Sequence, residues 1–325
     1  ENYFAPVVSH CDVDVDKFQM EDKEKCDLFE KYRHSDFVLL KIRYIGGGEI
    51  DNFIMQNTNN SLIMLMFTSS YTHMLKSLQM LLNVKICHFD IKAANIVYDK
   101  DKSMPIIVDF GLSINFDKIN MKKSFFMEST KYYIWPLEVH LLNHILHVNE
   151  TITESEMKKL AHDYTKHNIV LRAFSPEFIK DFEKECYHEL SKYIGKDSDG
   201  IIKRILKYWP TWDNYALSLL YIKLIYYVIR NDEGVIIKNK FVTFFVELCL
   251  KNVHPNPKKR LSVEETLKSF NLFIYNQQID KDVMFEDIMQ QIDANKDTIN
   301  SAIKADRKYM SLLSEKTKST KRIIN

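Results

Sequence analysis

The stretch His88-Phe89-Asp90-Ile91-Lys92-Ala93-Ala94-Asn95 is followed, fourteen residues after Asn95, by Asp109-Phe110-Gly111. Short apolar runs around these two stretches predict strands at residues 85–87, 96–98 and 105–108, joined by polar loops. The acidic, basic and amide side chains therefore stand on a loop and at a strand end, where functional groups are usually presented. A glycine directly after Asp109-Phe110 lets the chain turn sharply there.

These side chains are the ones that transfer of a phosphoryl group from a nucleotide to a hydroxyl requires. A carboxylate can orient the hydroxyl and accept its proton, and an ammonium group can steady the phosphoryl group. An amide oxygen and a second carboxylate can hold Mg²⁺, a hard cation that prefers oxygen ligands. Asp90, Lys92, Asn95 and Asp109 supply that set.

The pattern His-x-Asp-x-Lys-x-x-Asn followed by Asp-Phe-Gly resembles the catalytic-loop and metal-loop signatures of the protein kinases. The resemblance implies that Asp90 is the catalytic base and that Lys92 contacts the γ-phosphate of ATP. It also implies that Asn95 and Asp109 bind Mg²⁺. A lysine two residues after the aspartate is similar to the Ser/Thr branch of the family. The implied function is a Ser/Thr protein kinase that uses ATP and Mg²⁺ and acts on a protein substrate.

Further segments resemble kinase landmarks in the family's order. Trp135-Pro136-Leu137-Glu138 stands where the Ala-Pro-Glu segment belongs, and residues 255–260 look like the late Arg motif. The resemblance implies a buried ion pair between Glu138 and Arg260. It also implies that Asp213, just before an apolar helix predicted at 216–230, accepts backbone hydrogen bonds from the 88–95 loop.

The nucleotide side of the site is expected near residues 37–49. The apolar run 37–42 predicts a strand, and the segment 44–49 that follows it resembles the kinase hinge and its exit. By the resemblance, backbone groups of Arg43, Tyr44 and Ile45 meet adenine, and the Ile42 side chain lies behind it.

Two kinase elements are missing before residue 37: a Gly-rich phosphate loop, and a strand lysine followed by a helix glutamate. The glycines at 46–48 cannot replace the loop, because they follow the hinge strand. We expect the full protein to carry these elements upstream of Glu1, and the 1–325 chain alone to bind ATP poorly. The alternative is a degenerate kinase that lacks them.

Two other departures concern regulation and size. Phe89 replaces the arginine of the family's His-Arg-Asp triplet, so a phosphate on Ser124, Ser129 or Thr130 would lack its usual partner. Residues 145–205 look like a helical insertion. This insertion, the Trp-Pro-x-Glu form and the Ile45-Gly46-Gly47 hinge are similar to kinases of large cytoplasmic DNA viruses, and the Lys/Ile/Asn/Tyr/Phe-rich composition agrees. The resemblance implies the host cytoplasm or the virion as location.

The resulting expectation is an α+β, protein kinase-like fold made mostly of its helical lobe. Residues 1–45 would be a remnant of the strand-rich lobe and hinge, and 46–275 the helical lobe. Residues 276–325 would form a helical tail. An apolar stripe predicts that this tail packs on the body, and its positions are Ile288, Ile292, Ile299, Ile303, Met310 and Leu313.

Composition limits the partners. The chain has 45 basic and 44 acidic residues, so the net charge of +1 predicts no nucleic-acid partner. Its apolar runs are shorter than a membrane span, so no membrane partner is predicted. The odd count of 5 cysteines without a Cys-x-x-Cys pair is typical of reduced thiols rather than of a disulfide framework or a zinc site. The oligomeric state is left open.

Two other functions remain in view. A pseudokinase or scaffold that binds partners through the insertion and the tail would explain the missing lysine and Gly-rich loop. A small-molecule kinase on the same fold is the other. Lys92 and the predicted pair of Glu138 with Arg260 favour a protein substrate, because small-molecule relatives often lack that substrate-side segment.

Overall fold

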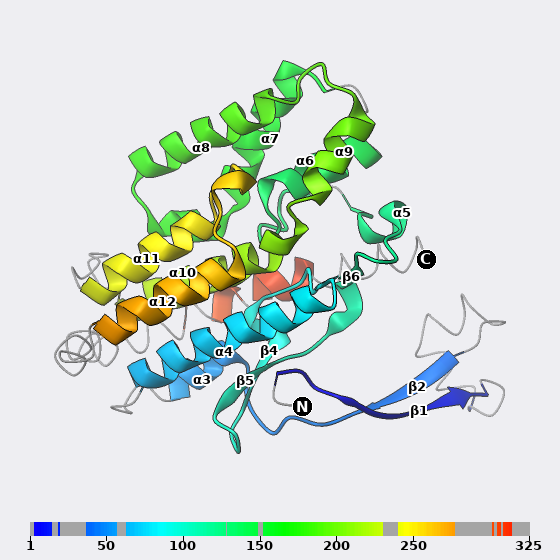
Figure 1. Ribbon diagram of the computed structural model, residues 1–325, viewed down its shortest axis with the longest axis vertical. Helices are drawn as coiled ribbons and strands as arrows, with labels where there is room; N and C mark the ends of the chain where they lie inside the picture. Colours follow the sequence, from blue (N-terminus) through cyan, green and yellow to red (C-terminus); the bar gives the residue numbers. More distant parts are fainter. Residues whose placement is uncertain are drawn as a thin grey trace.

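The computed structural model describes residues 3–14, 19, 37–56, 63–127, 129–148, 152–229, 240–276, 301, 304–306 and 308–313. Within these ranges the chain is a mixed α+β structure dominated by helices, with short antiparallel strand pairs (Figure 1).

The strands are β1 (Val7–Val13), β2 (Phe37–Ile42), β3 (Ile86–Cys87), β4 (Ile96–Asp99), β5 (Met104–Ile107) and β6 (Ile114–Asn115). The α-helices are α3 (Ile50–Gln56), α4 (Ile63–Asn83), α5 (Met121–Ser124), α6 (Leu137–His147), α7 (Glu154–His167), α8 (Pro176–Ser191), α9 (Ser198–Leu206), α10 (Trp212–Ile229), α11 (Lys240–Asn252) and α12 (Val263–Asn276). Short 3-10 turns are η2 (Ala93–Asn95), η3 (Phe110–Leu112), η4 (Ile169–Ala173), η5 (Trp209–Thr211) and η6 (Pro257–Lys259).

The strands predicted around the 88–95 loop are present, and they lie in two antiparallel pairs at the ends of the loop. β3 pairs with β6, and β4 pairs with β5 from Ile96↔Ile107 to Asp99↔Met104. The turn of the β4–β5 hairpin is closed by the Tyr98 hydroxyl, which donates to the carbonyl oxygen of Ser103 at 2.7 Å. Because the hairpin begins just after Asn95 and ends just before Asp109, it brings two of the predicted site residues to the same end.

The core is built around α10. The sequence predicts a buried helix at 216–230, and the structure confirms it, with the helix already starting at Trp212. Tyr221 of α10 packs on Tyr71 of α4, with ring centroids 4.7 Å apart. Tyr71 also makes edge contacts with Phe245 of α11 and Phe270 of α12 at 4.9 and 5.0 Å. These aromatic contacts fix four helices to one another behind the loop.

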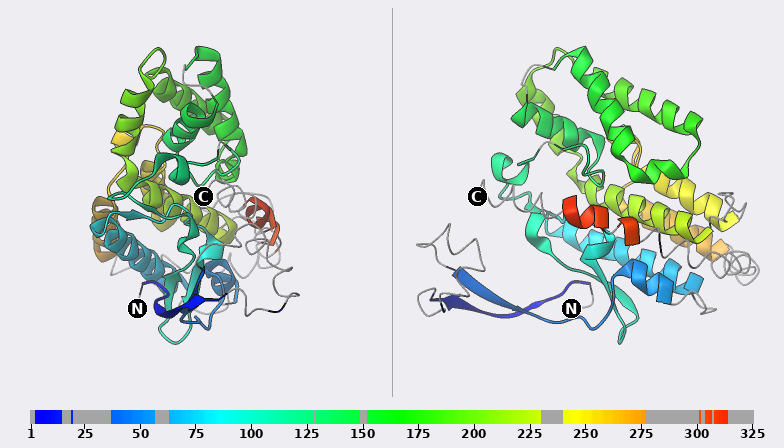
Figure 2. Two further views of the ribbon diagram at one scale, coloured as in Figure 1. Left: turned by 90° about the vertical axis from the view of Figure 1, so that its right-hand side faces the viewer. Right: turned by 180° about the vertical axis from the view of Figure 1, so that it is seen from behind.

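The described residues of the predicted insertion, 145–148 and 152–205, are mostly helical, as expected. Helices α7 and α8 pack against each other, and α9 packs against α6 (Figure 2). Local sequence explains where α7 starts: Thr153 and Glu156 form a capping box that satisfies backbone groups of the first turn. Its C-terminal neighbour Asn168 caps the following η4 turn by accepting from the backbone N–H of Val170.

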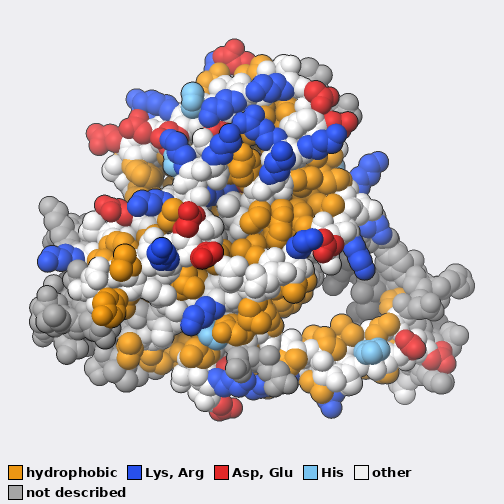
Figure 3. All heavy atoms as spheres, in the orientation of Figure 1, with side chains coloured by type: hydrophobic (Ala, Val, Ile, Leu, Met, Phe, Trp, Pro, Cys, Tyr) orange, Lys and Arg blue, Asp and Glu red, His pale blue; other side chains and the backbone are white. Residues whose placement is uncertain are grey.

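Residues 7–13 and 37–42 form an antiparallel hairpin, and the strand predicted at 37–42 is present. The hairpin projects from the helical body (Figure 1), and open space separates it from the body in the space-filling view (Figure 3). Its apolar side chains are largely exposed, as Leu39 at 61% and Ile42 at 54% illustrate.

The tail is described only at 301, 304–306 and 308–313, where it is helical and lies on the helical body (Figure 2). Met310 is buried and Leu313 packs on the core, as the apolar stripe predicts. The other stripe positions, Ile288, Ile292, Ile299 and Ile303, lie outside the described residues. Among the helices described, none is both long and apolar enough to cross a bilayer.

Candidate active site

The first turn of α10 holds the 88–95 loop in place. The backbone N–H groups of His88 and Phe89 donate to the two carboxylate oxygens of Asp213, at 2.6 and 2.8 Å. This is the contact that the sequence predicts for Asp213. The hydrogen bond to Asp213 stabilises Phe89 in a left-handed conformation, with φ of 65°, which costs energy in a non-glycine residue. Burial raises the pKa of the Asp213 carboxyl, and hydrogen bonds from the loop oppose that rise.

Asp90, Lys92 and Asn95 are in direct contact and almost fully buried. Lys92 Nζ donates to Asp90 Oδ2 at 3.0 Å, and Asn95 Nδ2 donates to the same oxygen at 2.8 Å. Asn95 Nδ2 also donates to the Asp90 backbone carbonyl at 2.9 Å. The η2 turn, in which Asn95 N donates to Lys92 O at 3.0 Å, provides this spacing.

The same hydrogen bonds orient the amide of Asn95. Because its nitrogen faces Asp90, its oxygen is the atom available to coordinate a cation. Asp109 follows β5 with φ of 63°, is exposed, and accepts from the Gly111 N–H at 3.2 Å through Oδ1. Val108 N donates to Asn95 O at 2.9 Å, which ties the two positions together. An amide oxygen and an exposed carboxylate on joined backbones fit a hard divalent cation.

The Phe89 side chain lies in an aromatic cluster. Its ring stacks on Trp135 with centroids 4.7 Å apart and meets Phe125 edge-on at 5.8 Å. Trp135 Nε1 also donates to the Phe89 carbonyl oxygen at 2.9 Å. Phe125 and Trp135 both belong to the segment between Asp109 and α6, so this cluster fastens that segment to the loop.

The ion pair predicted between Glu138 and Arg260 is present and buried. Arg260 Nη1 and Nη2 donate to Glu138 Oε1 and Oε2 at 2.6 and 2.8 Å, a bidentate geometry that matches guanidinium to carboxylate. Trp212 Nε1 also donates to Glu138 Oε1 at 3.1 Å. The first turn of α6 is therefore joined to both α10 and the η6 turn.

Residues 42–45 lie at the foot of the β1–β2 hairpin. Ile45 is buried, but Tyr44 is 87% exposed and Ile42 is 54% exposed. Arg43 is placed by its backbone N–H, which donates to Pro6 O at 3.1 Å, and by an ion pair with Asp99 at 3.3 Å. These contacts orient the segment along β4, and they do not enclose Ile42 and Tyr44.

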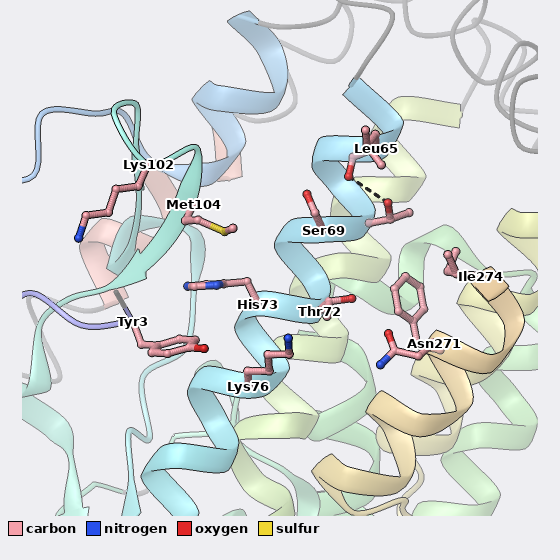
Figure 4. Close-up of a pocket in the computed structure, with 12 residues that line it drawn as sticks. Tyr3, Leu65, Ser69, Thr72, His73, Lys76, Lys102, Met104, Asn271 and Ile274 are labelled. Carbon is pink, nitrogen blue, oxygen red and sulfur yellow. Dashed lines mark hydrogen bonds between the residues drawn. The ribbon is translucent and has the colours of Figure 1, made fainter. Parts of the chain in front are cut away.

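Two of the hollows formed by the described residues lie beside the 88–95 loop and beside α4. A cavity of 340 Å³ lies beside the 88–95 loop, lined by Lys92, Asn95 and Tyr133 and closed on one side by tail residues Asp306 and Met310. A hollow of 780 Å³ lies between α4, α12 and the β4–β5 hairpin (Figure 4). In the larger one Tyr3 stacks on His73 at 4.5 Å, and its lining contains none of the predicted site residues.

One contact in the site is not predicted by the sequence. The Tyr132 hydroxyl donates to Asp90 Oδ1, and Lys92 Nζ lies 3.5 Å from the same hydroxyl. No spacing or motif points to Tyr132, because the position of a side chain in that segment depends on how the segment packs on the loop.

The family described as Protein kinase domain matches residues 19–270, which is more than half of the chain. No curated protein matches the chain.

Proposed function

Because the chain belongs to the protein kinase domain family, we propose that it transfers the γ-phosphate of ATP to Ser and Thr hydroxyls of protein substrates. The family supports phosphotransfer to proteins, and the choice of Ser and Thr rests on Lys92. The observation that carries the proposal is the buried contact among Asp90, Lys92 and Asn95, with the amide oxygen of Asn95 directed away from Asp90.

In this proposal Asp90 holds the acceptor hydroxyl and takes its proton as the new O–P bond forms, while the bond from the γ-phosphorus to the β-phosphate oxygen breaks and ADP leaves. Lys92, which hydrogen-bonds Asp90, supplies a positive charge beside the transferring group. Asn95 and Asp109 would hold Mg²⁺, which neutralises phosphate charge when bound.

The nucleotide would bind at residues 42–45, between the β1–β2 hairpin and the helical body. A two-stranded hairpin buries too little surface to be stable on its own, and this one exposes Val8, Leu39 and Leu40. We propose that residues 1–45 are part of a strand-rich lobe whose other strands cover the hairpin. The helical lobe would then span 46–275 and the tail 276–325.

A second candidate is a binding module on a kinase fold. Two observations favour it: Asp90 is fully buried with Tyr132 on its Oδ1, and the side chains of Ile42 and Tyr44 are exposed rather than enclosed. Such a protein would keep the loop architecture without turning over ATP.

The test is phosphate transfer from labelled ATP to a generic protein substrate, using full-length protein with Mg²⁺. Asp90→Asn and Asp109→Ala should each lower the rate, the former by about 10²–10⁴-fold, the usual contribution of a general base. Asp181→Asn on the exposed surface of α8 is the matched control and should leave the rate unchanged. Phosphoamino-acid analysis of the product would show Ser and Thr.

If the intact protein transfers no phosphate to any of several substrates, and Asp90→Asn behaves like the parent, the binding-module function replaces the kinase. Transfer to small alcohols but not to proteins would instead indicate a small-molecule kinase.

A further inference from the structure

Tyr132 lies between Asp109 and α6, and it is fully buried. Its hydroxyl donates a hydrogen bond to Asp90 Oδ1. Lys92 Nζ lies 3.5 Å from that hydroxyl and 5.8 Å from the centroid of the Tyr132 ring. The phenol therefore contacts both groups that the proposed function assigns to the acceptor hydroxyl and the transferring phosphoryl group.

The other carboxylate oxygen of Asp90 is engaged as well. Oδ2 accepts from Lys92 at 3.0 Å and from Asn95 at 2.8 Å, and the residue has no exposed surface. A general base must come within hydrogen-bond reach of the proton that it removes. In this arrangement the place beside Oδ1 is taken by Tyr132, so a hydroxyl from another molecule cannot reach the base.

Hydrogen bonds hold the backbone on both sides of Tyr132. Tyr132 N donates to Ser129 O and Trp135 N donates to Tyr132 O, both at 3.1 Å. Trp135 is in turn bonded to the Phe89 carbonyl oxygen. Burial and the negative charge of Asp90 hold the pKa of Tyr132 well above its ordinary value, so the phenol keeps its proton and remains a donor.

We propose that Tyr132 is a gating residue of the acceptor site. Its hydroxyl occupies the place of the substrate hydroxyl, and a protein substrate reaches Asp90 only after the Tyr132 side chain has rotated away. The role of Asp90 as the base at the acceptor site rests on the proposed function. Whether Tyr132 blocks access to the Asp90 carboxylate can be tested independently of that function.

The first experiment compares kcat/KM for a protein substrate between the parent and Tyr132→Phe. Removing the hydroxyl releases Oδ1, so kcat/KM should rise by about ten- to a hundredfold, the size expected for one hydrogen bond to a charged group. Tyr164→Phe is the matched control, since Tyr164 is also a buried phenol but pairs with the hydroxyl of Tyr215. A fall in kcat/KM for Tyr132→Phe alone would mean that the phenol positions Asp90 for catalysis, and would overturn the gate.

The second experiment measures access to Asp90 directly, by carbodiimide labelling of carboxylates and mass spectrometry. Asp90 should be protected in the parent and labelled several-fold faster in Tyr132→Ala, while Asp213, buried elsewhere under the loop, stays protected in both and reports an intact fold. Equal protection of Asp90 in both proteins would overturn the gate. If labelling responds but no form of the protein transfers phosphate, the gate stands and the proposed function fails.

Discussion

At the residue scale, burial determines the chemistry of side chains close to the 88–95 loop. His140 of α6 is buried, and its Nε2 lies 3.1 Å from the backbone oxygen of Trp135, the residue that stacks on Phe89. Its Nδ1 has no hydrogen-bond partner among the described residues. Burial lowers the pKa of His140 from 6.5 to about 3. The ring is therefore a neutral packing element.

This pKa makes His140 a source of acid sensitivity. The unfolded chain binds a proton at His140 below pH 6.5, whereas the folded chain binds it only near pH 3. The contribution of His140 to the unfolding free energy is thus fully present above pH 6.5 and is lost as the pH decreases toward 3. His140→Gln should make the pH dependence of the unfolding free energy shallower in that window, by about 1.4 kcal/mol per pH unit. Urea denaturation at several pH values would measure it.

His162→Gln serves as the control, because His162 is exposed on α7 and pairs with Glu183. Equal slopes for His140→Gln and the parent would show that His140 is not protonated differently in the two states.

At the element scale, α6 is where the segment after Asp109 is anchored. Its first turn carries Glu138, whose carboxylate accepts two hydrogen bonds from the Arg260 guanidinium and one from the Trp212 indole. Just before α6, Trp135 stacks on Phe89. The start of α6 is therefore joined to the 88–95 loop, to α10 and to the η6 turn. The segment between Asp109 and α6 is thus held by packing and by a buried ion pair.

Breaking that ion pair should be costly. Glu138→Gln leaves the buried Arg260 charge without its counter-charge, which we expect to lower the unfolding free energy by about 3–5 kcal/mol. Chemical denaturation would measure the loss. Glu154→Gln, which removes an exposed pair with Lys158, should leave stability nearly unchanged. A loss of similar size in both variants would show that the buried pair has no special role.

The packing of Phe89 on Phe125 and Trp135 indicates how the segment between Asp109 and α6 is held in order. If Phe89 stacking replaces a phosphate and its arginine, then Ser124→Ala, Ser129→Ala and Thr130→Ala combined should retain phosphate transfer. Phe89→Ala should instead destabilise the fold by about 3–5 kcal/mol, the usual cost of removing a buried phenylalanine ring. Transfer assays and thermal unfolding of both variants test this. Loss of transfer in the triple variant, with unchanged stability, would restore phosphorylation as the control.

At the scale of the whole molecule, the tail completes the helical body. α10 is apolar nearly all round, but it carries Lys223, which is 8% exposed. The Lys223 ammonium group forms an ion pair with Asp306 of the tail, and Met310 is buried one helical turn further on. The tail therefore neutralises a charge inside the body and also forms one wall of the cavity beside Lys92.

A double-mutant cycle tests this arrangement. Asp306→Leu alone should destabilise the protein because Lys223 then stays buried without its counter-charge, whereas adding Lys223→Met to Asp306→Leu should recover much of the loss. We expect a coupling energy of roughly 0.5–3 kcal/mol, typical of residues in direct contact. Additive effects of the two substitutions in denaturation experiments would mean that the tail does not depend on this pair.

The sequence by itself determined the local parts of this protein. Asp90, Lys92 and Asn95 share one loop, and a single hairpin leads from Asn95 to Asp109, so their spacing along the chain is enough to bring them together. The buried helix α10 was predictable because a helix that is apolar all round has nowhere else to lie. The pair Glu138 and Arg260, 122 positions apart, was predictable only through the family resemblance.

Only the tertiary structure decided the contacts between distant segments. Tyr132 meets Asp90 across 42 positions and Lys223 meets Asp306 across 83, and no motif marks either pair. Such contacts depend on how the aromatic core orients the helices and the segment that crosses them, which residue patterns along one element do not encode. The chain therefore specifies its chemistry locally, while access to that chemistry is a property of the packed molecule.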